Sequence, residues 1–222
     1  MTGPTPARPL ARRDPAKTRA RILKVAVAEF SSKGYSGARM QSIAIRARTN
    51  IRMLYHYWGG KDALYVGVLE HVLADLRRQE LQLDLQDADP LEGILQVFEF
   101  MAAHFASRPE LRCLLAYENL NRARHLKRST VVREKASPVI ALLDRLLRRG
   151  EAAGLLSPGL DPLQVYVAMV SLAYYSRAHV HTLSRIFDTD LQQPAWQHAY
   201  HRQSRHMLTC FLTAREFLAH AA

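Results

Sequence analysis

The chain has 222 residues, 48% of them hydrophobic, and a formal net charge of +11. This is enough apolar material to bury one large domain or two small ones, which excludes disorder throughout. No apolar run approaches the roughly 20 residues of a membrane helix, and the first residues lack the apolar centre of a secretory signal, so we expect a cytoplasmic protein.

The net charge is concentrated at one end of the sequence. Residues 1–62 hold thirteen Lys or Arg against three Asp or Glu, a net charge of +10, and the remaining residues contribute +1. Such asymmetry indicates a polyanionic partner, either nucleic acid or an anionic membrane surface, reached through one end of the molecule. A solvated basic face without a partner is the alternative.

The first predicted elements are an arm and a helix. Residues 1–13 combine three prolines, a glycine and three arginines with little to bury, so we expect a mobile basic arm. Asp14 and Pro15 form an N-cap and first-turn pair. They predict a helix at about 15–33, with Gly34 as its left-handed stop.

Two short helices follow. Residues 38–50, "ARMQSIAIRARTN", predict a short amphipathic helix whose apolar face holds Met40, Ile43, Ala44 and Ala47. After a turn of about three residues, Asn50 is expected to cap a second short helix through Tyr57. Two short helices joined by a tight turn behind a longer one are typical of a helix-turn-helix.

The second short helix has two different faces. On a wheel of 100° per residue, Met53, Leu54, Tyr57 and Trp58 share the arc that we expect to pack against the preceding helices. The opposite arc, expected to face outward at the most basic end of the molecule, holds Ile51, Arg52, Tyr55 and His56. A solvated face is the alternative for this outward set.

The rest of the chain is predicted to be helical, at about 61–83, 90–107, 109–124, 129–153, 162–187 and 194–219. Prolines stand near four of these starts, Asp89 and Asp161 are suited to cap two of them, and Pro138 is expected to kink its helix. The predicted fold is therefore all-α. A three-helix helix-turn-helix domain at 14–64 precedes a larger helical domain at 65–222.

Residues 18–70 resemble the DNA-binding domain of the TetR family of bacterial transcriptional regulators. The shared pattern joins F-x-x-x-G-Y at the end of the first helix, I-A in the second, then L-Y-H-Y-aromatic and a K-[DE]-A-L start to the fourth. "RPELRCLLAYENLNRARHLKRS" and "GLDPLQVYVAMVSLAYYSRAHVHTLSRIF" also resemble the C-terminal domain of one branch of the family.

The resemblance implies a homodimer on a double-stranded, palindromic DNA operator, most often a repressor, released by a small-molecule effector in the C-terminal domain. It implies that Tyr55 and Lys61 contact phosphates, and that Gln41, Ile51 and Arg52 can reach bases. Arg52 can fork onto guanine, and Gln41 can pair with adenine. The full expected DNA-binding set is Arg39, Gln41, Asn50, Ile51, Arg52, Met53, Tyr55, His56 and Lys61.

Three residues depart from the family pattern. The family usually has glycine in the turn where this chain has Arg48, a small residue in place of Arg52, and a hydroxyl in place of Met53. A left-handed Arg48 would cost about 1–2 kcal/mol, so we expect the turn to adopt another shape.

The larger domain carries apolar stripes that we assign to a four-helix dimer interface, a monomer core being the alternative. The expected interface residues are Val165, Met169, Leu172, Trp196, Tyr200, Met207, Phe211 and Ala214. Polar residues on helices that otherwise look buried could bind the effector, and the candidates are Tyr117, Glu118, Asn121, Arg122, Tyr174, Tyr175 and His179. An internal Glu118–Arg122 salt bridge with tyrosines at the interface is the alternative.

The sequence shows no HExxH, GxSxG, phosphate loop or GxGxxG motif, so we expect no enzyme, cofactor or metal site, and no membrane partner. The two cysteines, Cys113 and Cys210, lack CxxC pairing and are expected to be small core side chains. A nonspecific architectural DNA binder remains a rival, although it leaves the large neutral domain unexplained.

Overall fold

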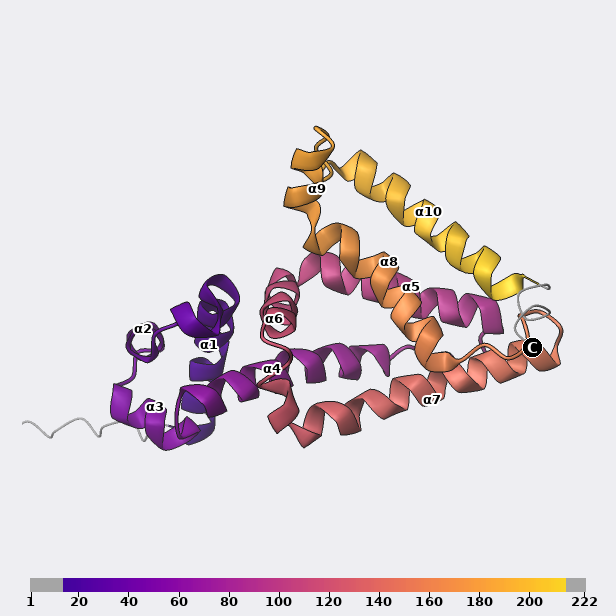
Figure 1. Cartoon of the computed structure of the whole chain (residues 1–222). Helices are drawn as coiled ribbons and strands as arrows, with labels where there is room; N and C mark the ends of the chain where they lie inside the picture. Colours follow the sequence, from indigo (N-terminus) through magenta and orange to yellow (C-terminus); the bar gives the residue numbers. More distant parts are fainter. Residues whose placement is uncertain (1–13, 215–222) are drawn as a thin grey trace, which may run out of the picture. The chain divides into compact units, whose positions relative to one another are not determined.

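The computed structural model describes residues 14–214, except for the side chains at positions 133 and 135–137. This part of the chain forms helices and no strand, which confirms the all-α fold (Figure 1). The helices are α1 (Pro15–Gly37), α2 (Met40–Arg46), α3 (Ile51–Trp58), α4 (Lys61–Glu80), α5 (Pro90–Ser107), α6 (Pro109–Leu120), a 3₁₀ turn (Leu126–Arg128), α7 (Thr130–Ala152), α8 (Pro162–Ala178), α9 (Val180–Ile186) and α10 (Pro194–Thr213).

The chain divides into two compact units between Val68 and Leu69, within α4. We name them the N-terminal unit and the C-terminal unit. The boundary expected from the sequence, between residues 64 and 65, lies in the same helix. The expected arm at 1–13 lies outside the described residues.

Aspartates cap three helices as the sequence predicts. Asp14, Asp89 and Asp161 each precede a proline and accept a hydrogen bond from a backbone N–H two or three residues later, at 2.9, 3.0 and 2.8 Å. Each carboxylate satisfies a donor that the first helical turn would otherwise leave free. Gly34 has a φ of 66°, as expected for a stop, although α1 continues past this interruption to Gly37.

Two predicted helices are interrupted where the sequence carries no marker. The helix expected at 109–124 stops at Leu120, because Arg122 and Ala123 both have a φ of 54°, which an α-helix cannot contain. The helix expected at 162–187 is two helices, since the backbone turns at His179 with a φ of −109° and a ψ of 12°. Neither break is marked by glycine or proline, the residues that announce a break in a sequence.

Each unit has its own core. In the N-terminal unit, Phe30 and Tyr65 are fully buried with ring centroids 4.8 Å apart, and Ile22, Ile43 and Leu54 are also fully buried. Burial of one such side chain stabilises the folded state by about 1.5–3 kcal/mol.

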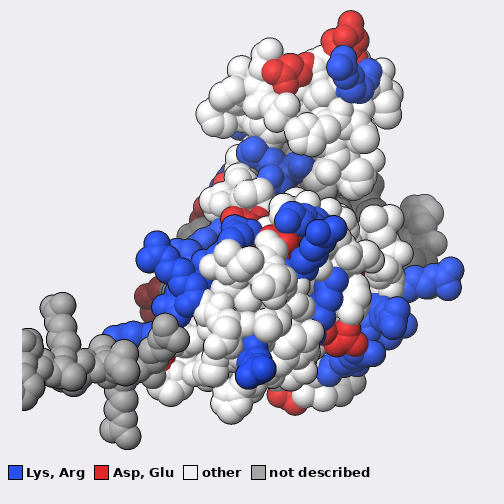
Figure 2. Space-filling view, turned by 90° about the vertical axis from the view of Figure 1, so that its left-hand side faces the viewer, with Lys and Arg blue, Asp and Glu red and all other residues white. Residues whose placement is uncertain are grey.

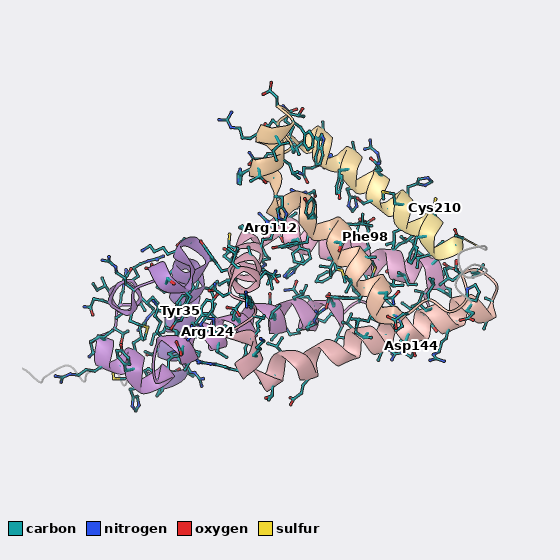
Figure 3. All side chains as sticks on the ribbon, viewed as in Figure 1. Tyr35, Phe98, Arg112, Arg124, Asp144 and Cys210 are labelled. Atoms are coloured by element: carbon teal, nitrogen blue, oxygen red, sulfur yellow. The ribbon has the colours of Figure 1, made fainter. Side chains whose placement is uncertain are left out.

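In the C-terminal unit, α5 packs against α7, α8 and α10. Its buried residues include Phe98, which is labelled in Figure 3, and Met101. Val165 and Met169 of α8 are also fully buried in this core.

Candidate nucleic-acid interface

A tight turn at residues 47–50 joins α2 to α3. The backbone N–H groups of Arg48 and Thr49 donate to carbonyls three and five residues earlier, each at 3.0 Å, which is the Schellman pattern of a helix end. Arg48 has a φ of 48°, in the left-handed region that usually holds glycine. The expectation of another turn shape is therefore wrong. Arg21 Nε also donates to the Ala47 carbonyl at 2.7 Å. Together these hydrogen bonds satisfy carbonyl groups at the C-terminal end of α2, with Arg48 in the left-handed position.

Helix α3 begins with a side-chain cap and has one buried and one exposed face. The Asn50 side chain accepts a hydrogen bond from the Met53 backbone N–H at 2.8 Å, as a capping residue should. Leu54 is fully buried, and Met53, Tyr57 and Trp58 are half-buried. The exposed residues are Arg52, Tyr55 and His56. Ile51, expected to face outward with them, is half-buried.

Trp58 fixes the C-terminal end of α3 against α4. A Cβ on Gly67 of α4 would lie 2.3 Å from a carbon of the Trp58 ring, so only glycine leaves room for this close packing. The Arg19 guanidinium lies 4.6 Å from the centre of the same ring, in a cation–π contact. With this end held in place, Arg52 and Tyr55 remain on the exposed side.

A buried glutamate that the sequence analysis did not single out joins α1 to α2. Glu29 has no exposed surface. Its carboxylate accepts hydrogen bonds from Lys33 Nζ at 2.7 Å, Arg46 Nη1 at 2.9 Å, Ser42 Oγ at 3.2 Å and the Arg39 backbone N–H at 3.5 Å. Burial by itself raises the pKa of Glu29, but the hydrogen bonds from Lys33, Arg39 and Ser42 outweigh it and hold the pKa below its usual value.

The start of α4 is held by contacts around Lys61. Its Nζ donates to the Ser36 carbonyl at 3.4 Å and lies 4.9 Å from the centre of the Tyr35 ring. The Tyr35 hydroxyl donates to the Asp62 carboxylate. Lys61 thus lies at the N-terminus of a helix, where free amides and the helix dipole favour an anion.

The exposed surface of the N-terminal unit is basic. In the view of Figure 2, Lys and Arg cover more of the visible surface than Asp and Glu. The exposed cations are Lys17, Arg19, Arg21, Lys24, Lys33, Arg39, Arg46, Arg48 and Arg52. Gln41 of α2 is exposed as well. Ile45, one turn further along α2 and 66% exposed, is an apolar residue that the sequence analysis did not select.

Comparison with known families decides how this arrangement is classified. Residues 22–68 match the bacterial regulatory proteins of the tetR family, and residues 90–208 match the tetracyclin repressor-like C-terminal domain. The chain belongs to the TetR family. The resemblance predicted from the sequence is therefore confirmed over both parts of the chain.

Individual TetR-family relatives agree with this assignment. The chain is 34% identical over 175 residues to the HTH-type transcriptional repressor NicS of Pseudomonas putida, which covers 79% of this chain and 82% of that protein. It is 41% identical over 112 residues to the HTH-type transcriptional repressor SCO4008 of Streptomyces coelicolor, covering 50% of this chain and 54% of that protein. The crystal structure of the transcriptional regulator SCO4942 of Streptomyces coelicolor aligns with a TM-score of 0.66 at 27% identity, covering 86% and 97%. These matches support DNA binding and repression by a regulator that is not an enzyme.

The effector candidates of this TetR-family chain have separate roles in the structure. Glu118 is buried, and its carboxylate contacts His125 Nδ1 at 2.8 Å and the His125 backbone N–H at 3.1 Å. The alternative of a Glu118–Arg122 salt bridge is wrong, because the left-handed turn after α6 leaves Arg122 exposed and brings His125 to the carboxylate. The exposed Asn121 donates its amide to the Tyr117 carbonyl at 2.7 Å.

The candidates at the end of α8 have partners other than Glu118. The half-buried Tyr174 donates to the Arg112 carbonyl at 3.3 Å. Tyr175 is exposed and stacks on the exposed His179 with ring centroids 4.3 Å apart. Tyr175 lines a cavity with Trp196 and Tyr200, between α8, α9 and α10.

The structure corrects part of the expected dimer interface. Val165 and Met169 have no exposed surface, so a partner chain cannot touch them in this conformation, and for them the prediction of an interface is wrong. They fill the core instead, because the turn of α8 that carries them faces α5. The outward stripe of α8 carries Leu163, Val167 and Tyr175, each about half exposed at 56%, 54% and 51%.

The expected interface residues on α10 remain accessible to different degrees. Met207 is 51% exposed. The half-buried residues are Trp196, Tyr200, Phe211 and Ala214, together with Leu172 of α8.

The expected burial of Cys113 and Cys210 is wrong, since both side chains are exposed and neither forms a disulfide. Within residues 14–214, no cluster of three or more His, Cys, Asp or Glu side chains could hold a metal ion, and no helix is long and apolar enough to cross a membrane.

Proposed function

We propose that this TetR-family chain represses transcription in the cytoplasm as a homodimer on a palindromic DNA operator, and that a small molecule bound by the C-terminal unit releases it. The observation that carries the proposal is the division of α3. Leu54 is fully buried and Trp58 fixes the end of the helix, while Arg52 and Tyr55 are exposed among the cations of α1 and α2.

We assign base recognition to Arg52 and Gln41, with Ile51 at the edge of the same face. A guanidinium can donate two hydrogen bonds to guanine, and a side-chain amide can pair with adenine, each good pair being worth about 1–3 kcal/mol of discrimination. Exposed Ile45 adds an apolar side chain on α2 that could contact a thymine methyl group.

We assign phosphate contact to Tyr55, Lys61 and Arg39. Lys61 is the first residue of α4, and within residues 14–214 its ammonium group makes one weak hydrogen bond, to the Ser36 carbonyl at 3.4 Å, that a phosphate oxygen can replace. Asn50 and Met53 place the first turn of α3, and His56 lies beside Arg52 on the exposed face. These residues position the protein and carry no sequence information themselves.

The second subunit is proposed to dock on the outward stripe of α8, together with Met207 on α10. Leu163 and Val167 are one turn apart, Tyr175 lies two turns further along the same side of α8 with exposed Ser171 between them, and a two-fold dimer uses the same face from both copies. Val167→Glu should convert the dimer to a monomer in sedimentation velocity, while Gln164→Glu, an exposed change one turn away, should leave it dimeric. Equal behaviour of the two variants would contradict this interface.

Binding to genomic DNA fragments, with competitor DNA at rising salt, tests the whole proposal. A regulator should retain a few palindromic fragments after the salt has removed the rest, because base contacts add to the salt-sensitive phosphate contacts. Uniform retention that disappears with salt would favour the nonspecific architectural binder instead.

A further inference from the structure

The C-terminal unit contains a cavity of about 290 Å³ between α5, α8 and α10. This volume is at the small end of the range for sites that bind organic molecules. Four alanines leave the space open, and Leu172 and Tyr200 add larger walls. The alanines are Ala102, Ala103, Ala106 and Ala173. The cavity lies apart from Glu118 and His125.

A buried hydroxyl in this cavity has no hydrogen-bond partner. Ser204 is 1% exposed, and its Oγ makes no hydrogen bond within the described part of the chain. Thr209 and Thr213 on the same helix each donate to the carbonyl four residues earlier, at 2.9 Å. Ser204 makes no such bond to the carbonyl four residues before it, that of Tyr200. A buried hydroxyl left unsatisfied is costly, so this position favours a ligand that supplies a polar atom.

The cavity also contains a cation without a counterion. The partly buried Arg177 makes no hydrogen bond or salt bridge with any residue in 14–214 whose side chain is described. Burial lowers the pKa of Arg177, and the positive charge of Arg112 lowers it further. Arg112, which is labelled in Figure 3, donates hydrogen bonds to the backbone carbonyls of Phe105 and Ala106 at the end of α5. Among the described residues, no carboxylate forms a salt bridge with either of these two guanidinium groups.

Glu99, the one acidic residue that lines the cavity, already contacts two other side chains. Glu99 contacts His201 Nε2 at 2.5 Å and Arg205 Nε at 3.3 Å. The His201 ring also stacks on Phe98, with centroids 5.4 Å apart and ring planes 5° from parallel. Glu99 is thus held by His201 and Arg205 and does not neutralise Arg177.

We propose that this cavity binds a small organic anion, with one carboxylate on an apolar body no larger than a single ring. The carboxylate pairs with Arg177, and the Ser204 side chain, which is 1% exposed in this conformation, turns to donate a hydrogen bond to it, while the ring lies against the alanines and Leu172. Charge-assisted hydrogen bonds between guanidinium and carboxylate are among the stronger polar contacts in proteins. The binding of the anion is independent of the proposed function, and its role as the effector rests on that function.

Calorimetric titration of the full chain with benzoate, and with benzamide as its uncharged counterpart, tests the site. Benzoate should bind about tenfold or more tightly than benzamide, since only benzoate offers an anion to Arg177. Arg177→Gln should remove that preference, and Ser204→Ala should weaken benzoate binding by about two- to fivefold. Arg202→Gln, an exposed change on α10, is the matched control and should have no effect.

Several results would overturn the site. These are the absence of benzoate binding at millimolar concentration, equal binding of benzoate and benzamide, and equal effects of Arg177→Gln and Arg202→Gln. Sedimentation velocity on Arg177→Gln is a further test. A shift from dimer to monomer would show that Arg177 serves the contact between subunits and would overturn its assignment to the anion site.

Operator affinity with and without benzoate separates this site from the proposed function. Benzoate that binds through Arg177 but leaves DNA affinity unchanged would confirm the anion site and reject its role as the effector site. Failure of the ligand-free protein to bind any operator would reject the proposed function and leave the anion site intact.

Discussion

The two units each bury a glutamate next to an arginine, and they do so in opposite ways. In the N-terminal unit, Glu29 is covered by Lys33 and Arg46, whose side chains remain about half exposed at 49% and 50%. In the C-terminal unit, Glu80 is completely buried with Arg77, only 15% exposed, at 2.6 Å. The first arrangement hides a negative charge beneath accessible cations, and the second removes both charges from the surface.

The pKa values follow this difference. The hydrogen bonds that Glu29 accepts hold its pKa below the usual value, despite burial. Burial dominates at Glu80 and raises its pKa, although Arg77 and Tyr166 work against the shift. Burial, together with the negative charge of Glu80, raises the pKa of Tyr166 to about 12. The two glutamates therefore differ in ionisation: the folded state favours the charged form of Glu29 and the neutral form of Glu80.

Glu80→Ala should have the largest effect on stability. Among the described residues, this change leaves the Tyr166 hydroxyl as the one hydrogen-bond partner of the buried Arg77 guanidinium. Removing one member of a buried pair costs about 3–5 kcal/mol, because the other charge remains out of water. Urea unfolding of the purified chain measures this loss, and a change below about 1 kcal/mol would contradict it.

Glu29→Ala should cost less, about 2–3 kcal/mol, because Lys33 and Arg46 can turn toward water while the Arg39 backbone N–H and Ser42 lose an acceptor. Thermal unfolding and operator binding should both weaken, since α1 and α2 lose their link. Glu29→Gln keeps an acceptor oxygen and should retain part of the stability. If Glu29→Ala destabilises the chain as strongly as Glu80→Ala, the solvent exposure of Lys33 and Arg46 does not reduce the cost of losing the glutamate, which would contradict this account.

The pH dependence should have opposite signs at the two sites. Glu29 has a lowered pKa in the folded state, so its stabilisation is present above the unfolded pKa and is lost as the pH falls through the folded value. Glu80 has a raised pKa, so its contribution is greatest below the unfolded pKa and is lost as the pH rises through the folded value. On acidification, the stability of the native chain relative to Glu29→Gln should therefore fall, whereas its stability relative to Glu80→Gln should rise. If both stability differences change in the same direction with pH, the opposite pKa shifts of Glu29 and Glu80 are wrong.

Arg48→Gly should have the smallest effect, a gain of about 0.5–1 kcal/mol. Glycine adopts the positive φ of this turn without the steric cost of a side chain, which the greater freedom of the unfolded chain partly offsets. Arg48→Ala removes the same charge but keeps the Cβ, so it controls for electrostatic effects. Equal melting temperatures for the two variants would show that the turn is not strained.

Much of the fold could be predicted because its signals are local. Asp14, Asp89 and Asp161 each stand before a proline and do cap helices. The apolar face around Leu54 and the cap at Asn50 were also visible in the sequence.

The missed features depend on contacts between distant residues or on backbone shapes without a marker. The left-handed Arg122 and Ala123 bring His125 to Glu118, and no glycine announces the turn. Helical periodicity identifies Val165 and Met169 as apolar, but it cannot tell a core from an interface. The cavity around Arg177 and Ser204 joins three helices that are far apart in the sequence.

The central claim is that the exposed face of α3 reads DNA sequence while neighbouring cations hold the backbone. Affinity of Arg52→Ala and Lys61→Ala for operator and random duplexes, measured across a range of salt concentrations, tests it most directly. Arg52→Ala should lose about 1–3 kcal/mol of discrimination, and Lys61→Ala should weaken both duplexes alike and reduce the salt slope by about one. Equal losses on operator and random DNA for Arg52→Ala would contradict the account.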